Sequence, residues 1–237
     1  NGLGLATRRG LLESLARALD DAGVKAIVVT GGTRAFSGGA DIREFNTPQA
    51  MQEPSLPTVI AAFERSPKPC VAAIEGMALG GGLELALGMH FRIADTRAQI
   101  GLPEVKLGIL PGAGGTQRFP RAVGLETALN MIVSGALVPA GKLAGTKLFD
   151  RVVDGDALAA ALAFAADAAT SGQALPRVRD WAIDHPNAEG FLGFARTAVA
   201  AASANYPAPL KCVDALEAAV APVRRELVHC RAAAEPC

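Results

Sequence analysis

The sequence predicts an α/β fold in which strands and helices alternate, followed by a helical region toward the carboxyl end. Over the first 150 residues, short apolar runs rich in β-branched residues alternate with stretches of helical spacing. Glycine-rich turns separate several of these segments. From about residue 155 the pattern is only helical and alanine is abundant. We therefore expect a core that carries the chemistry at 1–153 and a helical region at 154–237.

The first elements of this core can be assigned from spacing and turn residues. Leucines recur at helical spacing over 5–19, and Gly23 marks the end of this predicted helix. The apolar run 25–30 predicts a buried strand, because it is short, β-branched and closed by two glycines. A loop is expected at 33–42. The polar stretch 43–54 contains two prolines and predicts an exposed connection.

The later elements follow from the same two patterns. Buried strands are predicted at 70–75, 90–94 and 98–102. Helices are predicted at 56–65, 80–87 and 125–133, with a glycine-rich loop at 111–116. The alanine-rich carboxyl-terminal region predicts further helices at 156–169, 188–204 and 210–221.

Charge and hydropathy exclude several classes of partner. The 237 residues carry 23 basic and 23 acidic side chains, and the formal net charge is zero. Phosphate-backbone binding normally needs a concentrated basic face, so we expect no nucleic-acid partner. No apolar stretch approaches the roughly 20 residues of a membrane span, so we expect no membrane partner. The chain begins at Asn1 inside a plausible structural unit, without a signal peptide, and we expect its true amino terminus to lie further upstream.

The cysteines and histidines are scattered along the chain. The cysteines are Cys70, Cys212, Cys230 and Cys237. Their spacing matches neither a zinc site nor a disulfide framework, so we expect no metal. Cys70 lies in an apolar run and is expected to be a buried small hydrophobe. A chain without disulfides fits a reducing compartment, and we expect a cytoplasmic location.

Two acidic residues in apolar surroundings are the strongest candidates for chemistry. Glu84 follows Gly80-Gly-Gly-Leu, and Glu104 follows Pro103. A lone carboxylate in such surroundings is costly, whereas two in one poorly hydrated pocket can divide acid and base roles. The alternatives are a solvent-facing acid at a helix start for Glu84 and a surface acid in a turn for Glu104.

Two glycine-rich segments are candidates for binding a negatively charged oxygen. The loop Phe36-Ser-Gly-Gly-Ala-Asp41 follows a predicted strand and can present the Ala40 N–H to a pocket. Gly80–Gly82 opens a predicted helix, whose first N–H groups have no internal partner, and Gly81 lets an oxygen approach. An ordinary tight turn and close helix–strand packing are the alternatives. Two N–H donors and two carboxylates together suit a carbonyl substrate that passes through an enolate.

Three ordered motifs give the sequence a resemblance to the crotonase, or enoyl-CoA hydratase, superfamily. They are Ala35-Phe-Ser-Gly-Gly-Ala-Asp-Ile42, Ala78-Leu-Gly-Gly-Gly-Leu-Glu84 and the stretch from Leu102 to Gln117. The resemblance implies a spiral of ββα units and an acyl-CoA thioester substrate. It also implies that the N–H groups of Ala40 and Gly81 form an oxyanion hole. Glu84 and Glu104 would then occupy the two hydratase carboxylate positions.

The resemblance further implies substrate contacts and a reaction. The positions that match family contacts to CoA, or for Gly112 to the catalytic water, are Arg34, Gly38, Asp41, Ile42, Arg43 and Gly112. The expected reaction is reversible syn hydration of a trans-2-enoyl-CoA in fatty acid β-oxidation, without a cofactor. Glu104, assisted by Glu84, is expected to deprotonate the water. A Δ3,Δ2-enoyl-CoA isomerase, which relies on the second acid alone, and a non-catalytic acyl-CoA-binding domain are the alternatives.

The carboxyl-terminal region adds a further expectation. Residues 180–217, including Asn205-Tyr-Pro-Ala-Pro-Leu210, resemble the linker after the hydratase half of bifunctional hydratase/3-hydroxyacyl-CoA dehydrogenases. A dehydrogenase domain, and with it NAD, is therefore expected only if the chain continues beyond Cys237. The family's first strand would precede Asn1. The resemblance leaves a homo-oligomer or a fused dehydrogenase as possible partners.

Overall fold

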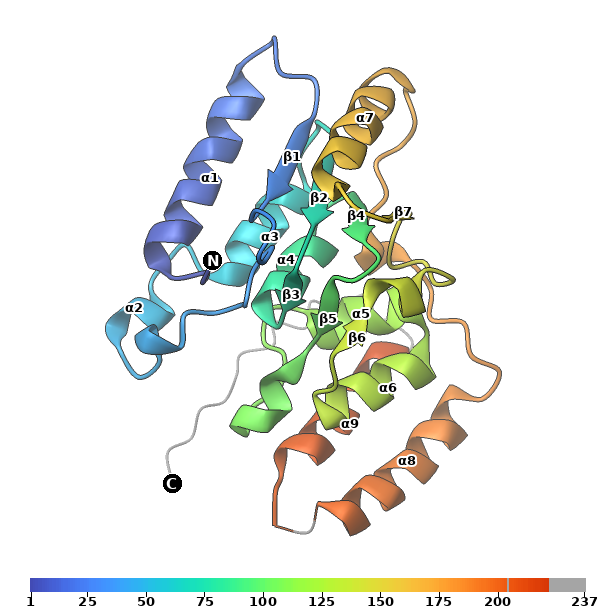
Figure 1. The fold of residues 1–237 in the computed structure, drawn as a ribbon. Helices are drawn as coiled ribbons and strands as arrows, with labels where there is room; N and C mark the ends of the chain where they lie inside the picture. Colours follow the sequence, from blue (N-terminus) through green and yellow to red (C-terminus); the bar gives the residue numbers. More distant parts are fainter. Residues whose placement is uncertain (204, 222–237) are drawn as a thin grey trace.

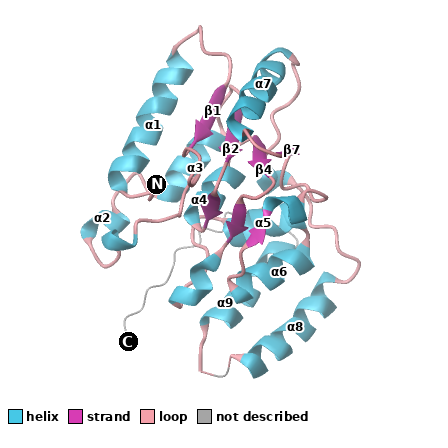
Figure 2. Cartoon of the chain, in the orientation of Figure 1, coloured by secondary structure: helices cyan, strands magenta, loops and turns pink. Residues whose placement is uncertain are grey.

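The computed structural model describes residues 1–203 and 205–221 (Figure 1). Strands and helices alternate over the first 153 residues, and helices alone follow, which confirms the predicted α/β class. Figure 2 shows the strands gathered at the centre with helices around them. Cys230 and Cys237 lie outside the described residues. Cys70 and Cys212, which are described, are free thiols and both are buried.

The central sheet has four parallel strands in the order β1-β2-β4-β7. Their bounds are β1 (Ile27–Thr30), β2 (Cys70–Ile74), β4 (Phe91–Asp95) and β7 (Arg151–Val153). Every residue of β2 and β4 is buried. Continuous apolar runs are typical of parallel strands that are covered on both faces, which explains why the sequence predicted β2 well. Strand β4 differs, because it buries Arg92 and Asp95 as well.

Successive residues of β2 point to opposite faces of the sheet. Val71 and Ala73 pack in a small cluster with alanines of helix α7 (Ala157–Thr170). Cys70, Ala72 and Ile74 pack into the main core on the other face. The alanine-rich sequence of α7 therefore serves close packing against the sheet.

A second, smaller sheet lies next to the first. Its strands are β3 (Met77–Leu79), β5 (Gln99–Gly101) and β6 (Val138–Pro139), and only the β5–β6 pair is antiparallel. Short 3₁₀ helices connect the elements at Ile42–Glu44 (η1), Pro103–Leu107 (η2), Ala140–Leu143 (η3) and Val178–Asp180 (η4).

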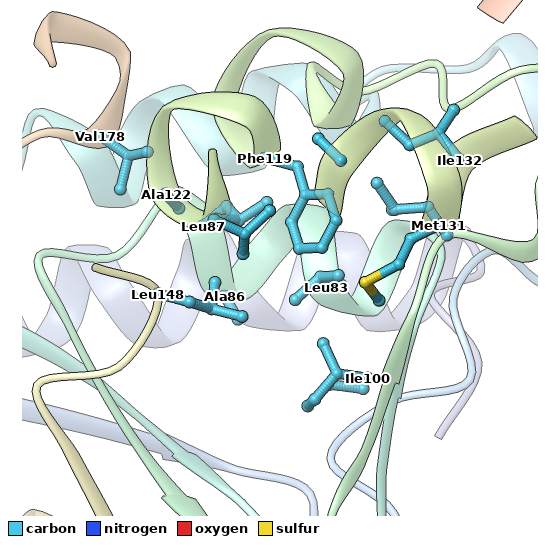
Figure 3. Close-up of a cluster of buried hydrophobic side chains, with 14 of the residues drawn as sticks. Leu83, Ala86, Leu87, Ile100, Phe119, Ala122, Met131, Ile132, Leu148 and Val178 are labelled. Carbon is cyan, nitrogen blue, oxygen red and sulfur yellow. The ribbon is translucent and has the colours of Figure 1, made fainter. Parts of the chain in front are cut away.

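The main core lies between helices and the sheets. These helices are α1 (Leu5–Asp20), α3 (Leu56–Glu64), α4 (Gly81–Leu87), α5 (Gly115–Val123) and α6 (Leu125–Ser134), and the short helix α2 (Pro48–Met51) lies outside this core. Figure 3 shows Leu83 and Leu87 of α4 facing Phe119 of α5, with Met131 of α6 beside them. These side chains are nearly or fully buried, so α4 is fixed in a dry core.

The last two described helices, α8 (Ala188–Ala202) and α9 (Ala208–Val220), form a hairpin. Helix α9 packs on α5 and α6 (Figure 1). Gln117 donates to the carbonyl oxygen of Ala215 at 3.0 Å, which ties α5 to α9. The region after residue 154 is thus packed against the core, and its separation as a second domain stays a prediction.

Helix α5 is the main element that the sequence pattern missed. Residues 111–116 were expected to form a loop, but the helix already begins at Gly115. Gly114 is its N-cap with a φ of 101°, and Pro120 lies inside the helix. Glycine and proline both disfavour helix, yet the amphipathic face of α5 is buried in the core, and tertiary packing overrides local propensity. The short strands β3, β6 and β7 were also missed.

Candidate active site

A cavity of about 520 Å³ lies where the loop after β1, the start of α4, η2 and the segment before α5 meet. Ligand sites commonly have volumes of about 300–1,000 Å³. All four main candidates line it, namely Ala40, Gly81, Glu84 and Glu104. The cavity therefore brings together residues that are far apart in the sequence. Much of its remaining wall is apolar, including Leu56, Leu107, Ile109 and Leu110.

The two candidate N–H donors lie side by side. A Cβ atom built on Gly81 would be 3.4 Å from the Ala40 nitrogen, and one built on Gly39 would be 3.0 Å from the Gly81 nitrogen. Gly39 has a φ of 93°, a conformation that favours glycine. Among the described residues neither N–H group donates a hydrogen bond to the protein. Both amides are therefore free for an oxygen atom in the cavity.

Backbone pairing holds the two segments together. Ser37 donates to the carbonyl oxygen of Met77, and Leu79 donates to that of Ser37, both at 3.0 Å. A Cβ atom on Gly82 would come within 2.5 Å of the Ser37 carbonyl oxygen. The loop after β1 is thus paired with β3 and packed closely on the start of α4, which brings the two N–H groups together.

The Glu84 carboxyl group is buried in the cavity wall, and its residue is 3% exposed. Its Oε1 accepts hydrogen bonds from Ala113 N at 2.8 Å and Gly115 N at 2.7 Å. A Cβ atom on Gly115 would lie 2.9 Å from that oxygen, so glycine allows the approach. The alternative of a solvent-facing acid at a helix start is wrong for Glu84.

The Glu104 carboxyl group is more accessible, and its own backbone N–H is the donor that opposes the rise in its pKa. It lies in η2 and faces the same cavity. Its Oε2 is buried and has no hydrogen-bond partner among the described residues. Burial, and then the negative charge of Glu84, raise the pKa of Glu104 to about 7. Glu104 is therefore not an ordinary surface acid.

The two carboxyl groups differ in the hydrogen bonds and charges around them. Burial raises the pKa of Glu84 too, but two N–H donors and the charge of Arg118 oppose that rise and favour the anion. Glu104 has no comparable donors and also meets the charge of Glu84. Two backbone N–H groups thus stabilise the anion of Glu84, whereas Glu104 has no such pair of donors from another segment.

A buried ion pair supports the loop that holds Glu84, and the sequence pattern did not reveal it. The Arg118 guanidinium donates to both carboxylate oxygens of Glu64, at 3.0 and 3.1 Å. It also donates to the Ala113 carbonyl oxygen at 3.4 Å. Glu64 is 2% exposed, and Arg179 reaches it at 3.2 Å. The sequence feature that could have indicated this ion pair is Glu64, an acid at the end of the apolar helix 56–64.

Removing the cation of this pair is expected to destabilise the fold. Arg118→Met leaves Glu64 buried with only the half-exposed Arg179 beside it, so we expect a loss of about 3 kcal/mol in the free energy of unfolding. Urea denaturation would measure it. The double variant Glu64→Met/Arg118→Met should recover most of that loss, since no buried charge is left. Equal instability of the single and double variants would contradict this explanation.

The other predicted substrate contacts are only partly at the cavity. Gly38, Asp41, Ile42 and Gly112 line it. Arg34 and Arg43 are not among the described lining residues. The Arg43 side chain is 87% exposed and pairs with Asp41 at 2.7 Å, which lowers the pKa of Asp41 to about 2. Contacts from these residues to CoA stay predictions.

A protein-family model described as enoyl-CoA hydratase/isomerase matches residues 1–178. The chain belongs to this family. The predicted family and its crotonase-like fold are thereby confirmed, and the predicted hydratase activity agrees with the family. Within the described residues, no group of three or more His, Cys, Asp or Glu side chains could hold a metal ion.

Individual relatives agree with this membership. The peroxisomal bifunctional enzyme of Danio rerio is 43% identical over 225 residues, covering 94% of this chain and 31% of that protein. The peroxisomal fatty acid beta-oxidation multifunctional protein MFP2 of Arabidopsis thaliana is 39% identical over 233 residues, with 93% and 32% coverage. An enoyl-CoA hydratase structure from Bacillus anthracis has a TM-score of 0.61 at 28% identity, with 93% and 82% coverage. The chain thus spans about a third of the length of these two curated relatives.

Proposed function

We propose that the cavity is the active site of an enoyl-CoA hydratase that adds water reversibly to a trans-2-enoyl-CoA and gives a 3-hydroxyacyl-CoA. The observation that carries this proposal is a pair of buried carboxyl groups sharing one cavity with two free backbone N–H groups. The apolar wall at Leu56, Leu107 and Ile109 fits an acyl chain. A place in fatty acid β-oxidation is supported by the name of the Arabidopsis relative.

In the proposed mechanism Glu84 is the base, because two N–H donors stabilise its anion. Glu104 is the acid, because its pKa is raised to about 7. The thioester carbonyl oxygen accepts hydrogen bonds from Ala40 and Gly81, which draws electron density from the double bond. The Glu84 carboxylate takes a proton from a water molecule, and the hydroxide oxygen bonds to C3. The electron pair of the double bond moves to the thioester as an enolate. Glu104 gives its proton to C2, and solvent then returns the two acids to their initial protonation states.

A direct spectroscopic assay tests the activity. The unmodified chain should consume crotonyl-CoA, with loss of the enoyl-thioester absorbance. A protein that binds an acyl-CoA in calorimetric titration but turns over neither short nor long enoyl-CoAs would instead be a binding domain, and the hydratase proposal would fail.

The pH dependence of hydration reports the acid form of Glu104. Because its pKa is raised to about 7, we expect kcat/KM to fall as the pH rises through that value. This fall is the alkaline limb of the pH profile. In Glu84→Gln, the alkaline limb of the residual kcat/KM should lie at lower pH, since the negative charge that raises the pKa of Glu104 is gone. An alkaline limb at an unchanged pH would contradict an electrostatic interaction between the two acids. Rates from pH 5 to 10 would measure it.

Isomerisation between Δ3 and Δ2 enoyl-CoA is a second candidate activity. The raised pKa lets Glu104 accept and return a proton near neutral pH, and moving a proton between C2 and C4 needs one such group. Glu84→Ala separates the two reactions. Hydration should collapse, whereas isomerisation should persist in part.

The relatives support our proposals on cofactors and partners. Hydration needs no cofactor, and CoA enters as part of the substrate. The zebrafish relative is named a bifunctional enzyme, so we propose a fused dehydrogenase domain that uses NAD in the whole protein, and a homo-oligomer is the alternative assembly.

No helix of the described residues is long and apolar enough to cross a membrane. We propose a reducing compartment because Cys70 and Cys212 are free, either the cytoplasm or, as in the names of the relatives, the peroxisome.

A further inference from the structure

The segment between α8 and α9 touches the turn that carries Glu104. The Tyr206 hydroxyl donates a hydrogen bond to the carbonyl oxygen of Val105, the residue after Glu104. The same carbonyl oxygen accepts from Gly108 N at 3.0 Å within the turn. A Cβ atom built on Gly108 would lie 3.7 Å from the Tyr206 oxygen, so the tyrosine ring lies directly against η2.

Helix α9 lies behind Glu104 as well. Cys212 is fully buried, and burial together with the charge of Glu104 raises the pKa of its thiol to about 11. Arg196 of α8 pairs with Asp214 and Glu217 of α9, which holds the hairpin together. Ion pairs thus hold α8 and α9 together, and the segment between them contacts η2 through the Tyr206 hydroxyl.

We propose that Tyr206 is a positioning residue that holds η2, so that the Glu104 carboxyl group stays in the cavity wall. This inference rests on the proposed hydratase function. The turn is only five residues long, and Glu104 Oε2 has no partner among the described residues that could hold the side chain. The orientation of the Glu104 side chain therefore depends on the backbone of the turn. The Tyr206 hydroxyl, which lies outside the turn, holds that backbone through its hydrogen bond to Val105.

The test is Tyr206→Phe, which removes the hydroxyl and keeps the ring. Losing one positioning hydrogen bond should lower kcat for crotonyl-CoA by roughly 3- to 10-fold, with KM changed by less than about twofold. The titratable groups that interact with Glu104 are Glu84 from α4 and Cys212 from α9. A looser turn hydrates Glu104, so the alkaline limb of kcat/KM should move to lower pH.

Ser203→Ala is the matched control. Its hydroxyl donates to Val199 on the same hairpin at 2.6 Å and does not reach η2. It should retain the parental kcat and pH limb, with a melting temperature similar to that of Tyr206→Phe. Parental kcat and limb in Tyr206→Phe, or equal losses in both variants, would overturn the inference. An inactive unmodified chain would overturn the hydratase proposal instead, so the two failures are distinguishable.

Discussion

Glu104→Gln is expected to lower kcat for the hydration of crotonyl-CoA by about 10²- to 10⁴-fold, and Glu84→Gln by a similar factor. The amide can still lie in the cavity but can neither give nor take the proton. The double variant should fall only slightly below the single ones, because the two acids act as a unit. Calorimetric affinity for the product should be retained in each. Hydration at the parental rate by Glu104→Gln would rule out the assignment.

The same substitution should stabilise the fold at alkaline pH. The folded pKa of Glu104 is raised, so its contribution to stability is fully present below its unfolded pKa and is lost as the pH rises through about 7. At pH 8 the native protein therefore carries an unfavourable buried charge that glutamine lacks. We expect Glu104→Gln to gain up to about 3 kcal/mol in urea denaturation at pH 8. No gain at pH 8 over pH 5 would contradict the raised pKa.

Gly81→Ala is expected to lower kcat by about 10²- to 10³-fold, comparable to losing one oxyanion donor. The new methyl group would lie 3.4 Å from the Ala40 nitrogen, where it crowds the position of the substrate oxygen. Its closest contact, 2.7 Å, is to the terminal Cδ2 of Leu56, which can rotate away. The fold should therefore persist, and steady-state kinetics with circular dichroism would measure both effects.

Gly145→Ala is the control for the glycine substitution. Gly145 has no atom within 4 Å of a built Cβ and lies outside the cavity lining. It should hydrate crotonyl-CoA at the parental rate. A parental rate in Gly81→Ala as well would show that the oxygen does not bind at this pair of amides.

The sequence predicted those elements whose signal is local. The buried strand at β2 and the helices at the carboxyl end follow from apolar runs and alanine-rich helical spacing. Helix α5 was missed because Gly114, Gly115 and Pro120 disfavour helix in isolation. Its amphipathic face becomes favourable only when the core surrounds it. Strand β7 has three residues and is fixed by pairing with β4.

The candidate site, too, has features that the local sequence predicts and features that depend on tertiary structure. Glu84 and Glu104 were identifiable because acids in apolar sequence need a reason to be there, and the motifs around them match a family. The sequence assigned the role of base to Glu104, whereas the mechanism that we propose from the structure assigns it to Glu84. That assignment depends on the N–H groups of Ala113 and Gly115, which lie 29 and 31 residues from Glu84.

The sequence motifs indicated the family by resemblance, and they identified the pair of acids and the two glycine segments that we propose as N–H donors. The folded chain decided how these groups differ: which carboxyl group receives hydrogen bonds, which is left without them, and how Arg118 and Tyr206 support the loops that carry them. The physical reason is that burial, charge and hydrogen bonding act through space. A pKa or a shared cavity is set by neighbours that only the tertiary structure brings together.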